Sequence, residues 1–244
     1  MICLIGLGLY DEEDLSMRAI EAIKECDSVY VEFYTSKWFG SLGKIEKMTK
    51  KKVIELSREK VESDFLINEA RTKVVALLVP GDPLAATTHM ELIIQAKKEK
   101  INTRIIHNAS IMISIAETGL WLYKFGRATT LVTPEKNYKP SSPFDIIIAN
   151  KKNGLHTLVL LDIKENKKYM TITEALKLLQ ELDRNKILWD EKIVACAKLG
   201  SGDQIIKYKK ISELIEDDIE ETPAILIVPG DMHFKEKEAL EMFP

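Results

Sequence analysis

The sequence predicts an α/β protein built from two α/β units. Three observations lead to this expectation. Short apolar runs of strand length alternate with amphipathic segments of helix length along the whole chain. A buried strand runs into the same loop twice, as Leu77-Leu78-Val79-Pro80-Gly81-Asp82 and as Ile225-Leu226-Ile227-Val228-Pro229-Gly230-Asp231. The length of 244 residues allows one large domain or two small ones.

Strands and helices alternate in the first half. Apolar runs predict strands at 2–6, 29–31, 53–56, 74–79 and 105–106. Apolar residues at helical spacing predict helices at 14–26, 61–70, 88–100 and 110–117. Asp14 is expected to cap the first helix, because an aspartate before a helix accepts hydrogen bonds from its free N–H groups. Gly40 and Gly43 are expected to keep the aromatic-rich segment after 29–31 in a loop.

The second half continues the alternation. Strands are expected at 131–132, 157–161, 193–199, 205–208 and 225–228, and helices at 144–153, 173–182 and 234–242. Thr173 is the expected cap of the second of these helices, and 134–143 is expected to be a polar loop. Gly200-Ser201-Gly202-Asp203 between two strands predicts a hairpin. Two α/β domains of ordinary size follow: 1–112, with the glycine and Pro-Gly-Asp loops, and 113–244.

Composition argues against several classes of protein. The net charge of −3 disfavours general nucleic-acid binding, and no apolar run approaches the roughly 20 residues of a membrane helix. The chain opens directly on a predicted strand, so no export signal is expected. Cys3, Cys26 and Cys196 are widely spaced and match no metal or redox pattern. We therefore expect a cytoplasmic protein with reduced, buried cysteines.

The loops after two predicted strands are the best candidates for a ligand site, because ligands of open α/β sheets bind outside the carboxyl ends of the strands. Gly6-Leu7-Gly8 follows the first strand but lacks the third glycine of a dinucleotide fingerprint, since position 11 is aspartate. Asp82 follows a buried strand, where its carboxylate can accept hydrogen bonds from ligand hydroxyl or amine groups. Two structural alternatives stay open: the glycines only shape a turn, or Asp82 caps the next helix.

Residues that commonly carry metal or covalent chemistry are dispersed. The four histidines, His89, His107, His156 and His233, form no i, i+4 pair, so no metal site is expected. Each histidine alone is more often structural than ligating. The chain also has no P-loop lysine motif and no nucleophile elbow. Any reaction is therefore expected to depend on positioning rather than on covalent catalysis, and no catalytic residue is assigned.

Six segments spread over the chain form a specific combination of motifs. They are Ile5-Gly6-Leu7-Gly8-Leu9-Tyr10-Asp11, Glu32-Phe33-Tyr34-Thr35-Ser36, Pro80-Gly81-Asp82-Pro83-Leu84-Ala85-Ala86-Thr87-Thr88-His89, His107-Asn108-Ala109-Ser110-Ile111, Leu122-Tyr123-Lys124-Phe125-Gly126 and His156-Thr157-Leu158-Val159-Leu160-Leu161-Asp162-Ile163-Lys164. In this combination the chain resembles the diphthine synthase family, within the tetrapyrrole-methylase-like class III superfamily. The resemblance covers essentially the whole length.

The resemblance implies a fold, a reaction and partners. The fold would be the two-domain α/β architecture of class III methyltransferases, with the cofactor cleft between the domains. The cofactor would be S-adenosylmethionine, which leaves as S-adenosylhomocysteine. The enzyme would methylate repeatedly the amino group of a 3-amino-3-carboxypropyl-histidine on translation elongation factor 2, forming diphthine. A homodimer is expected, with no membrane or direct nucleic-acid partner.

The resemblance also implies which residues contact the cofactor. In the first domain they are Leu9, Asp82, Ala85, Ser110 and Ile111. In the second domain they are Leu161, Leu199 and Ala224. Several would act through backbone amides and carbonyls, so the identity of the side chain matters less there. His107 is a candidate for the base that deprotonates the substrate amine, motivated only by its place before Ser110.

Two other functions remain open. One is a related class III methylase that acts on a tetrapyrrole or on RNA, which activity on porphyrin or corrin substrates would reveal. The other is a non-catalytic regulator of translation that binds the donor and elongation factor 2 without transferring a methyl group. The full-length resemblance speaks against the first, and no feature of the sequence favours the second.

Overall fold

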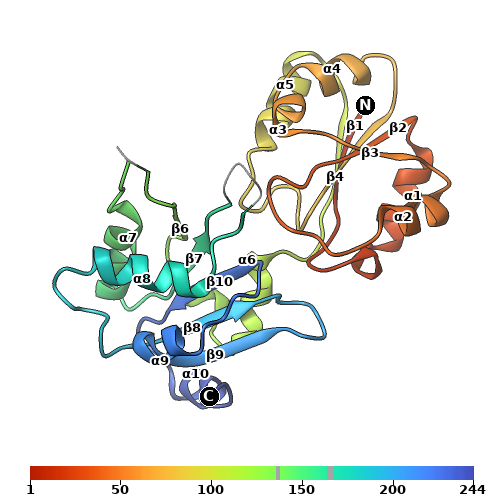
Figure 1. Cartoon of the computed structure of the whole chain (residues 1–244). Coiled ribbons are helices and arrows are strands. Elements are labelled where there is room, and N and C mark those ends of the chain that lie inside the picture. Colours follow the sequence, from red (N-terminus) through yellow and green to blue (C-terminus); the bar gives the residue numbers. More distant parts are fainter. Residues whose placement is uncertain (136–137, 164–167) are drawn as a thin grey trace. The chain divides into compact units, whose positions relative to one another are not determined.

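The computed structural model describes residues 1–135, 138–163 and 168–244 (Figure 1). Contacts divide the chain into two units, Met1–Ser114 and Ile115–Pro244; the boundary expected from the sequence followed residue 112. Residues 136–137 of the expected polar loop and Lys164 of the last motif lie outside the described residues. Within the described ranges, no helix is both long enough and apolar enough to cross a bilayer.

The first unit contains a parallel five-stranded sheet in the order β3-β2-β4-β1-β5. Its strands are β1 (Ile2–Gly6), β2 (Ser28–Val31), β3 (Val53–Glu55), β4 (Val75–Val79) and β5 (Thr103–Ile106). Its helices are the 3-10 helix η1 (Glu12–Asp14), α1 (Met17–Glu25), α2 (Leu42–Thr49), α3 (Arg58–Val61), α4 (Phe65–Ala70), α5 (Met90–Lys98) and α6 (Ile111–Ser114).

Alternate residues of β1 enter two separate hydrophobic clusters, because successive side chains of a strand point to opposite faces. Cys3 and Ile5 pack with residues of α1 and α2, whereas Ile2 and Leu4 pack with residues of α4 and α5. Figure 1 shows the same division, with α1 and α2 on one side of the strands and α3, α4 and α5 on the other. Since helices cover both faces, the ends of the strands are the places where loops can form a site.

Two expectations for the start of the first unit were wrong. Ser16, not Asp14, caps α1: its hydroxyl accepts a hydrogen bond from Ala19 N at 3.1 Å. Asp14 lies in η1, where its carboxylate accepts a hydrogen bond from Tyr10 N at 2.8 Å and so is not available to α1. Gly43 does not break the chain but lies inside α2.

The expected helix 61–70 was also wrong, because the chain forms two helices, α3 and α4, over this stretch. The hydroxyl of Ser63 donates to Lys60 O at 2.9 Å and accepts from Phe65 N at 3.3 Å. Serine side chains that bond to nearby backbone groups compete with the helical pattern. The break therefore lies at this serine.

The second unit contains a mixed five-stranded sheet in the order β6-β7-β10-β8-β9, in which only β6 and β7 are parallel. Its strands are β6 (Thr129–Leu131), β7 (Thr157–Leu161), β8 (Lys192–Ala197), β9 (Ile205–Lys210) and β10 (Ala224–Val228). Its helices are the 3-10 helices η2 (Ile115–Thr118) and η3 (Leu122–Lys124), followed by α7 (Ser142–Lys152), α8 (Ile172–Leu182), α9 (Ile211–Glu216) and α10 (Phe234–Leu240).

The second unit matches most of its expected elements. The hairpin prediction is confirmed, since β8 and β9 pair antiparallel. The cap of α8 was misplaced: Thr171, rather than Thr173, accepts a hydrogen bond from Glu174 N at 3.1 Å, and the Glu174 carboxylate accepts one from Thr171 N. This reciprocal pair is a capping box. Helix α9 was not expected; it buries Ile211 and Leu214 against the main hydrophobic cluster of this unit.

Candidate functional site

In the first unit, the loops after β1 and β4 are joined by backbone hydrogen bonds. β1 and β4 are parallel neighbours, so their carboxyl ends lie side by side. Gly81 N donates to Gly8 O at 2.7 Å, and Gly8 N donates to Gly81 O at 3.2 Å. The two glycine loops, far apart in the sequence, therefore form one structure at the edge where ligands of α/β sheets bind.

Packing explains two of the glycines in these loops. A Cβ atom at Gly6 would lie 2.5 Å from Gly81 O and 2.8 Å from the Cβ atom of Asn108. Gly8 has a φ of +82°, and a Cβ there would lie 2.2 Å from the Cβ of Asp14. Gly6 is thus required for the loops to approach each other, and Gly8 for the chain after β1 to turn close to Asp14, whatever the loops bind.

Asp82 connects the loop after β4 to the loop after β5. Its Oδ1 accepts a hydrogen bond from Leu84 N at 2.9 Å. Its Oδ2 accepts one from Asn108 N at 3.2 Å and lies 2.7 Å from Nδ1 of His107. The alternative that Asp82 caps the next helix is wrong, because α5 begins at Met90.

Asn108 is a residue of this site that sequence reasoning did not single out. Its Nδ2 donates to Gly6 O and to Asp14 O, both at 3.0 Å, and its Oδ1 accepts from Ala109 N at 2.8 Å. One side chain therefore holds the loops after β1 and β5 together. The signal was present in the motif His107-Asn108-Ala109-Ser110-Ile111, but nothing local indicates its distant partners.

The structure brings the candidate cofactor contacts of the first unit to one edge. They follow three adjacent strands in the order β4-β1-β5. They are Leu9 after β1, Asp82 and Ala85 after β4, and Ser110 and Ile111 after β5. Ser110 is buried, and its carbonyl accepts hydrogen bonds from Ile113 N and Ser114 N at the start of α6.

The candidate contacts of the second unit also lie near one another. Leu161 is the last residue of β7 and Ala224 the first of β10. These strands pair antiparallel with Ile225 opposite Leu160, so both ends fall on the same edge of the sheet. Ala224 lies opposite Ala197, the last residue of β8. Leu199 follows two residues after the end of β8.

The sequence model of the Tetrapyrrole (Corrin/Porphyrin) Methylases matches residues 1–215. The chain belongs to this methylase family. The diphthine synthase of Methanocaldococcus jannaschii is 44% identical over 251 residues, covering 99% of this chain and 98% of that protein. The diphthine synthase of Methanococcus aeolicus is 43% identical over 249 residues, covering 99% and 97%.

A solved structure of a diphthine synthase also matches this chain over its full length. A diphthine synthase crystal structure superposes with a TM-score of 0.90 at 36% identity, covering 100% of this chain and 96% of that one. The resemblance expected from the motifs and the α/β fold of this class are both confirmed. The chain is a methyltransferase of the tetrapyrrole methylase family.

The second Val-Pro-Gly-Asp loop of this methylase differs from the first. β10, which leads into it, is antiparallel to both of its neighbours, whereas β4 is parallel to both of its own. Gly230 N donates to Nδ1 of His156 at 2.9 Å, and Asp231 N donates to Gly154 O at 3.0 Å. The two loops therefore have different hydrogen-bond partners: the first is bonded to the glycine loop after β1, and the second to residues just before β7.

His156 belongs to a buried polar network of the methylase. Because its Nδ1 accepts a hydrogen bond, its Nε2 carries the proton and donates to Glu236 Oε1 at 2.9 Å. Glu236 is fully buried and also accepts from Lys124 Nζ at 2.5 Å, Trp121 N at 2.9 Å and His233 N at 2.7 Å. Burial lowers the pKa of His156. Burial acts to raise the pKa of Glu236, but these hydrogen bonds outweigh it and hold that pKa at about 2.

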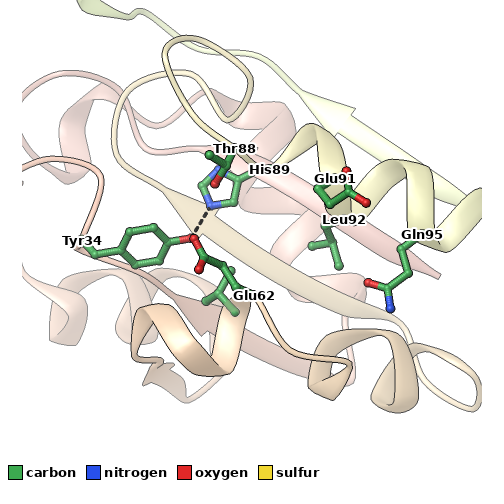
Figure 2. Close-up of a pocket in the computed structure, with 8 residues that line it drawn as sticks. Tyr34, Glu62, Thr88, His89, Glu91, Leu92 and Gln95 are labelled. Atoms are coloured by element: carbon green, nitrogen blue, oxygen red, sulfur yellow. Dashed lines mark hydrogen bonds between the residues drawn. The ribbon is translucent and has the colours of Figure 1, made fainter. Parts of the chain in front are cut away.

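A cavity of about 230 Å³ lies in the first unit, on the α5 side of its sheet (Figure 2). Val61 and Leu92 supply part of its apolar wall, and Tyr34 and His89 lie at one end. Figure 2 shows the Tyr34 hydroxyl pointing at the imidazole of His89, and the two groups are 3.2 Å apart. No group of three or more metal-ligating side chains occurs in the ranges that the structure describes.

Proposed function

We propose that this methylase transfers methyl groups from S-adenosylmethionine to the amino group of the 3-amino-3-carboxypropyl-histidine of translation elongation factor 2, forming diphthine in diphthamide biosynthesis. The supporting observation is the full-length similarity to diphthine synthases, at 40–44% identity in six relatives and 97% or more of their length. A cytoplasmic location follows from this partner, since translation elongation takes place there. A homodimer that does not bind nucleic acid directly is part of the same proposal.

The first-unit loops fit a ligand with hydroxyl and amine groups. A Cβ atom at Gly81 would have no neighbour closer than 3.8 Å, so a ligand can approach the backbone there. An ionised carboxylate offers about four lone-pair sites. The protein donors at Asp82 are Leu84 N, Asn108 N and His107 Nδ1, which leaves acceptor capacity for a ligand.

We assign donor binding to the same residues that the family resemblance indicated. Asp82 would accept hydrogen bonds from the donor, while Leu9, Ala85, Ser110 and Ile111 would contact it partly through their backbone. Leu161, Leu199 and Ala224 are the proposed donor contacts of the second unit. S-adenosylmethionine supplies an electrophilic methyl group on its sulfonium. The protein must then hold the amine in line with that methyl group and exclude water.

The attacking amine must be neutral, so a group has to accept its proton. We propose His107, whose exposed ring lies with Nδ1 2.7 Å from Asp82 Oδ2; when the ring is neutral and Nδ1 donates to that carboxylate, Nε2 has the lone pair that can accept the proton. His107→Ala should lower the rate of methyl transfer about 100-fold or more, since a general base typically contributes 10²–10⁴. Single-turnover rates at saturating donor measure this. An unchanged rate would remove His107 from the mechanism.

Asp82→Ala should raise the Kd of S-adenosylmethionine roughly ten- to a hundredfold, because a hydrogen bond to a charged group is worth about 1.5–3 kcal/mol. Isothermal titration calorimetry measures the Kd directly. Asp145→Ala, which removes an exposed carboxylate on α7, is the control. If both variants bind the donor like the unaltered protein, Asp82 is not a donor contact.

The function itself is tested by intact-mass spectrometry of elongation factor 2 that carries the aminocarboxypropyl-histidine, after incubation with this methylase and S-adenosylmethionine. A gain of three methyl groups supports diphthine formation, and a gain of four indicates an additional methyl ester. The description of the matched family favours one competing substrate class, corrins and porphyrins. No gain on elongation factor 2, together with methylation of a porphyrin, would overturn the proposal.

A further inference from the structure

We propose that His89 is a positioning residue that clamps the donor-binding loop through the carbonyl of Pro83, in the tautomer that this carbonyl requires and that a hydrogen bond from Tyr34 supports. The inference rests on the proposed donor site at Asp82 and Ala85. His89 touches neither residue; it acts on the segment between them. Its ring is buried, and its Nδ1 lies 3.2 Å from Pro83 O.

The hydrogen bonds determine the tautomer. A carbonyl oxygen only accepts hydrogen bonds, so Nδ1 of His89 must carry the proton that reaches Pro83 O. Burial lowers the pKa of His89, which keeps the ring neutral and leaves Nε2 as an acceptor. The Tyr34 hydroxyl, 3.2 Å away, is the donor to Nε2. Burial raises the pKa of Tyr34, so its proton is retained.

Tyr34 is itself held in place by a buried carboxylate. Glu32 is fully buried, and its Oε2 accepts hydrogen bonds from Tyr34 N at 2.9 Å and Thr35 N at 3.1 Å. Its Oε1 accepts a hydrogen bond from the Thr35 hydroxyl. The turn after β2 therefore has a defined shape, and it aims the phenol at His89.

The clamped loop needs such support because it contains a strained residue. Ala86 has a φ of 56°, in the left-handed region that non-glycine residues rarely adopt. Pro83 O accepts two hydrogen bonds from residues beyond Ala86: one from the Thr87 hydroxyl at 2.8 Å and one from His89. Strained conformations persist where several contacts determine them together. The clamp thus fixes how the chain leaves Asp82 and passes Ala85.

Calorimetry on three variants separates positioning from general stability. His89→Ala should raise the Kd of S-adenosylmethionine at least fivefold, and Tyr34→Phe, which removes only the hydroxyl, should raise it by a smaller factor. Leu92→Ala, which removes a buried side chain from the wall of the same cavity, should lower the melting temperature but leave the Kd unchanged. A His89→Ala protein with an unaltered Kd and a melting temperature lowered like that of Leu92→Ala would overturn the proposal.

The cavity offers a second test with a chemical rescue. It adjoins His89, so free imidazole can reach the space that His89→Ala opens. Imidazole should restore part of the donor affinity of His89→Ala and none of that of Asp82→Ala. Should His89→Ala fail to fold, nitrogen NMR of the His89 ring tests the clamp without that variant: the Nδ1–H tautomer should dominate in the unaltered protein and, because Pro83 O still accepts from Nδ1, should also remain the major tautomer in Tyr34→Phe.

The possible results distinguish a failure of the His89 clamp from a failure of the proposed donor site. A dominant Nε2–H tautomer in the unaltered protein would overturn the clamp, whatever the donor affinity. If His89→Ala binds the donor normally while Asp82→Ala does not, only the clamp fails. If Asp82→Ala binds normally as well, the donor site is misplaced and the clamp fails with it. None of these measurements uses elongation factor 2, so an error in the methyl acceptor leaves the test intact.

Discussion

Replacing Gly6 with alanine should destabilise the first unit by about 1–3 kcal/mol, the usual cost of overpacking a close contact, and should raise the Kd of S-adenosylmethionine at least tenfold. The added Cβ would lie 2.5 Å from Gly81 O, a backbone atom, and 2.8 Å from the Cβ of Asn108. Neither neighbour is the free end of a flexible side chain, so the loops after β1, β4 and β5 must move apart. These loops carry every proposed donor contact of that unit.

Gly202→Ala is the matched control, because a Cβ atom at that glycine has no neighbour within 4 Å. Thermal unfolding and donor titration of both variants check the prediction. Gly6→Ala should lose stability and affinity together, while Gly202→Ala should keep both. If Gly6→Ala bound the donor with an unchanged Kd, the tight junction of the three loops would not be needed for binding.

The order of strands along the chain could be predicted because each strand is a local apolar run. The position of a cap was harder to predict. Asp14 and Ser16 are both good capping residues two positions apart, and the choice depends on Tyr10 N, which takes the carboxylate of Asp14. Likewise, the helical state of Gly43 depends on the burial of Ile45 and Thr49 of the same helix, which no local pattern reveals.

In the candidate site, too, the local pattern predicted the position of the loops but not the contacts between them. Loops at strand ends could be located from the sequence, since the sheet rule needs only the strand order. The partners of Asp82 could not, because His107 and Asn108 are 25 and 26 residues away along the chain. Tyr34 and His89 are 55 residues apart, and neither shows a local pattern that would pair them. Side-chain hydrogen bonds between distant loops follow from the tertiary fold, so the local spacing of apolar residues does not predict them.

The largest loss of stability is expected from Glu236→Ala, at about 3–5 kcal/mol, because it leaves a partly buried cation without its partner. Lys124 would keep its bond to Asp231 O but lose the carboxylate, and His156 would lose the acceptor of its Nε2 proton. Glu238→Ala is the matched control on the same helix: Glu238 is exposed and pairs with the exposed Lys235. Urea unfolding of both variants at neutral pH measures the difference, and equal midpoints would refute a stabilising role for the network.

The same network sets an acid limit on stability. The folded pKa of Glu236, about 2, lies below its ordinary value of 4.5, so its contribution is complete above pH 4.5 and is lost as the pH falls through 2. The shift corresponds to about 3 kcal/mol. The lowered pKa of His156 acts in the same direction, starting as the pH falls below 6.5. Glu236→Gln keeps the shape of the side chain but cannot titrate, so its unfolding free energy should fall less steeply than that of the unaltered protein between pH 4.5 and 2. Parallel curves over that range would show that the charge of Glu236 contributes nothing to folding.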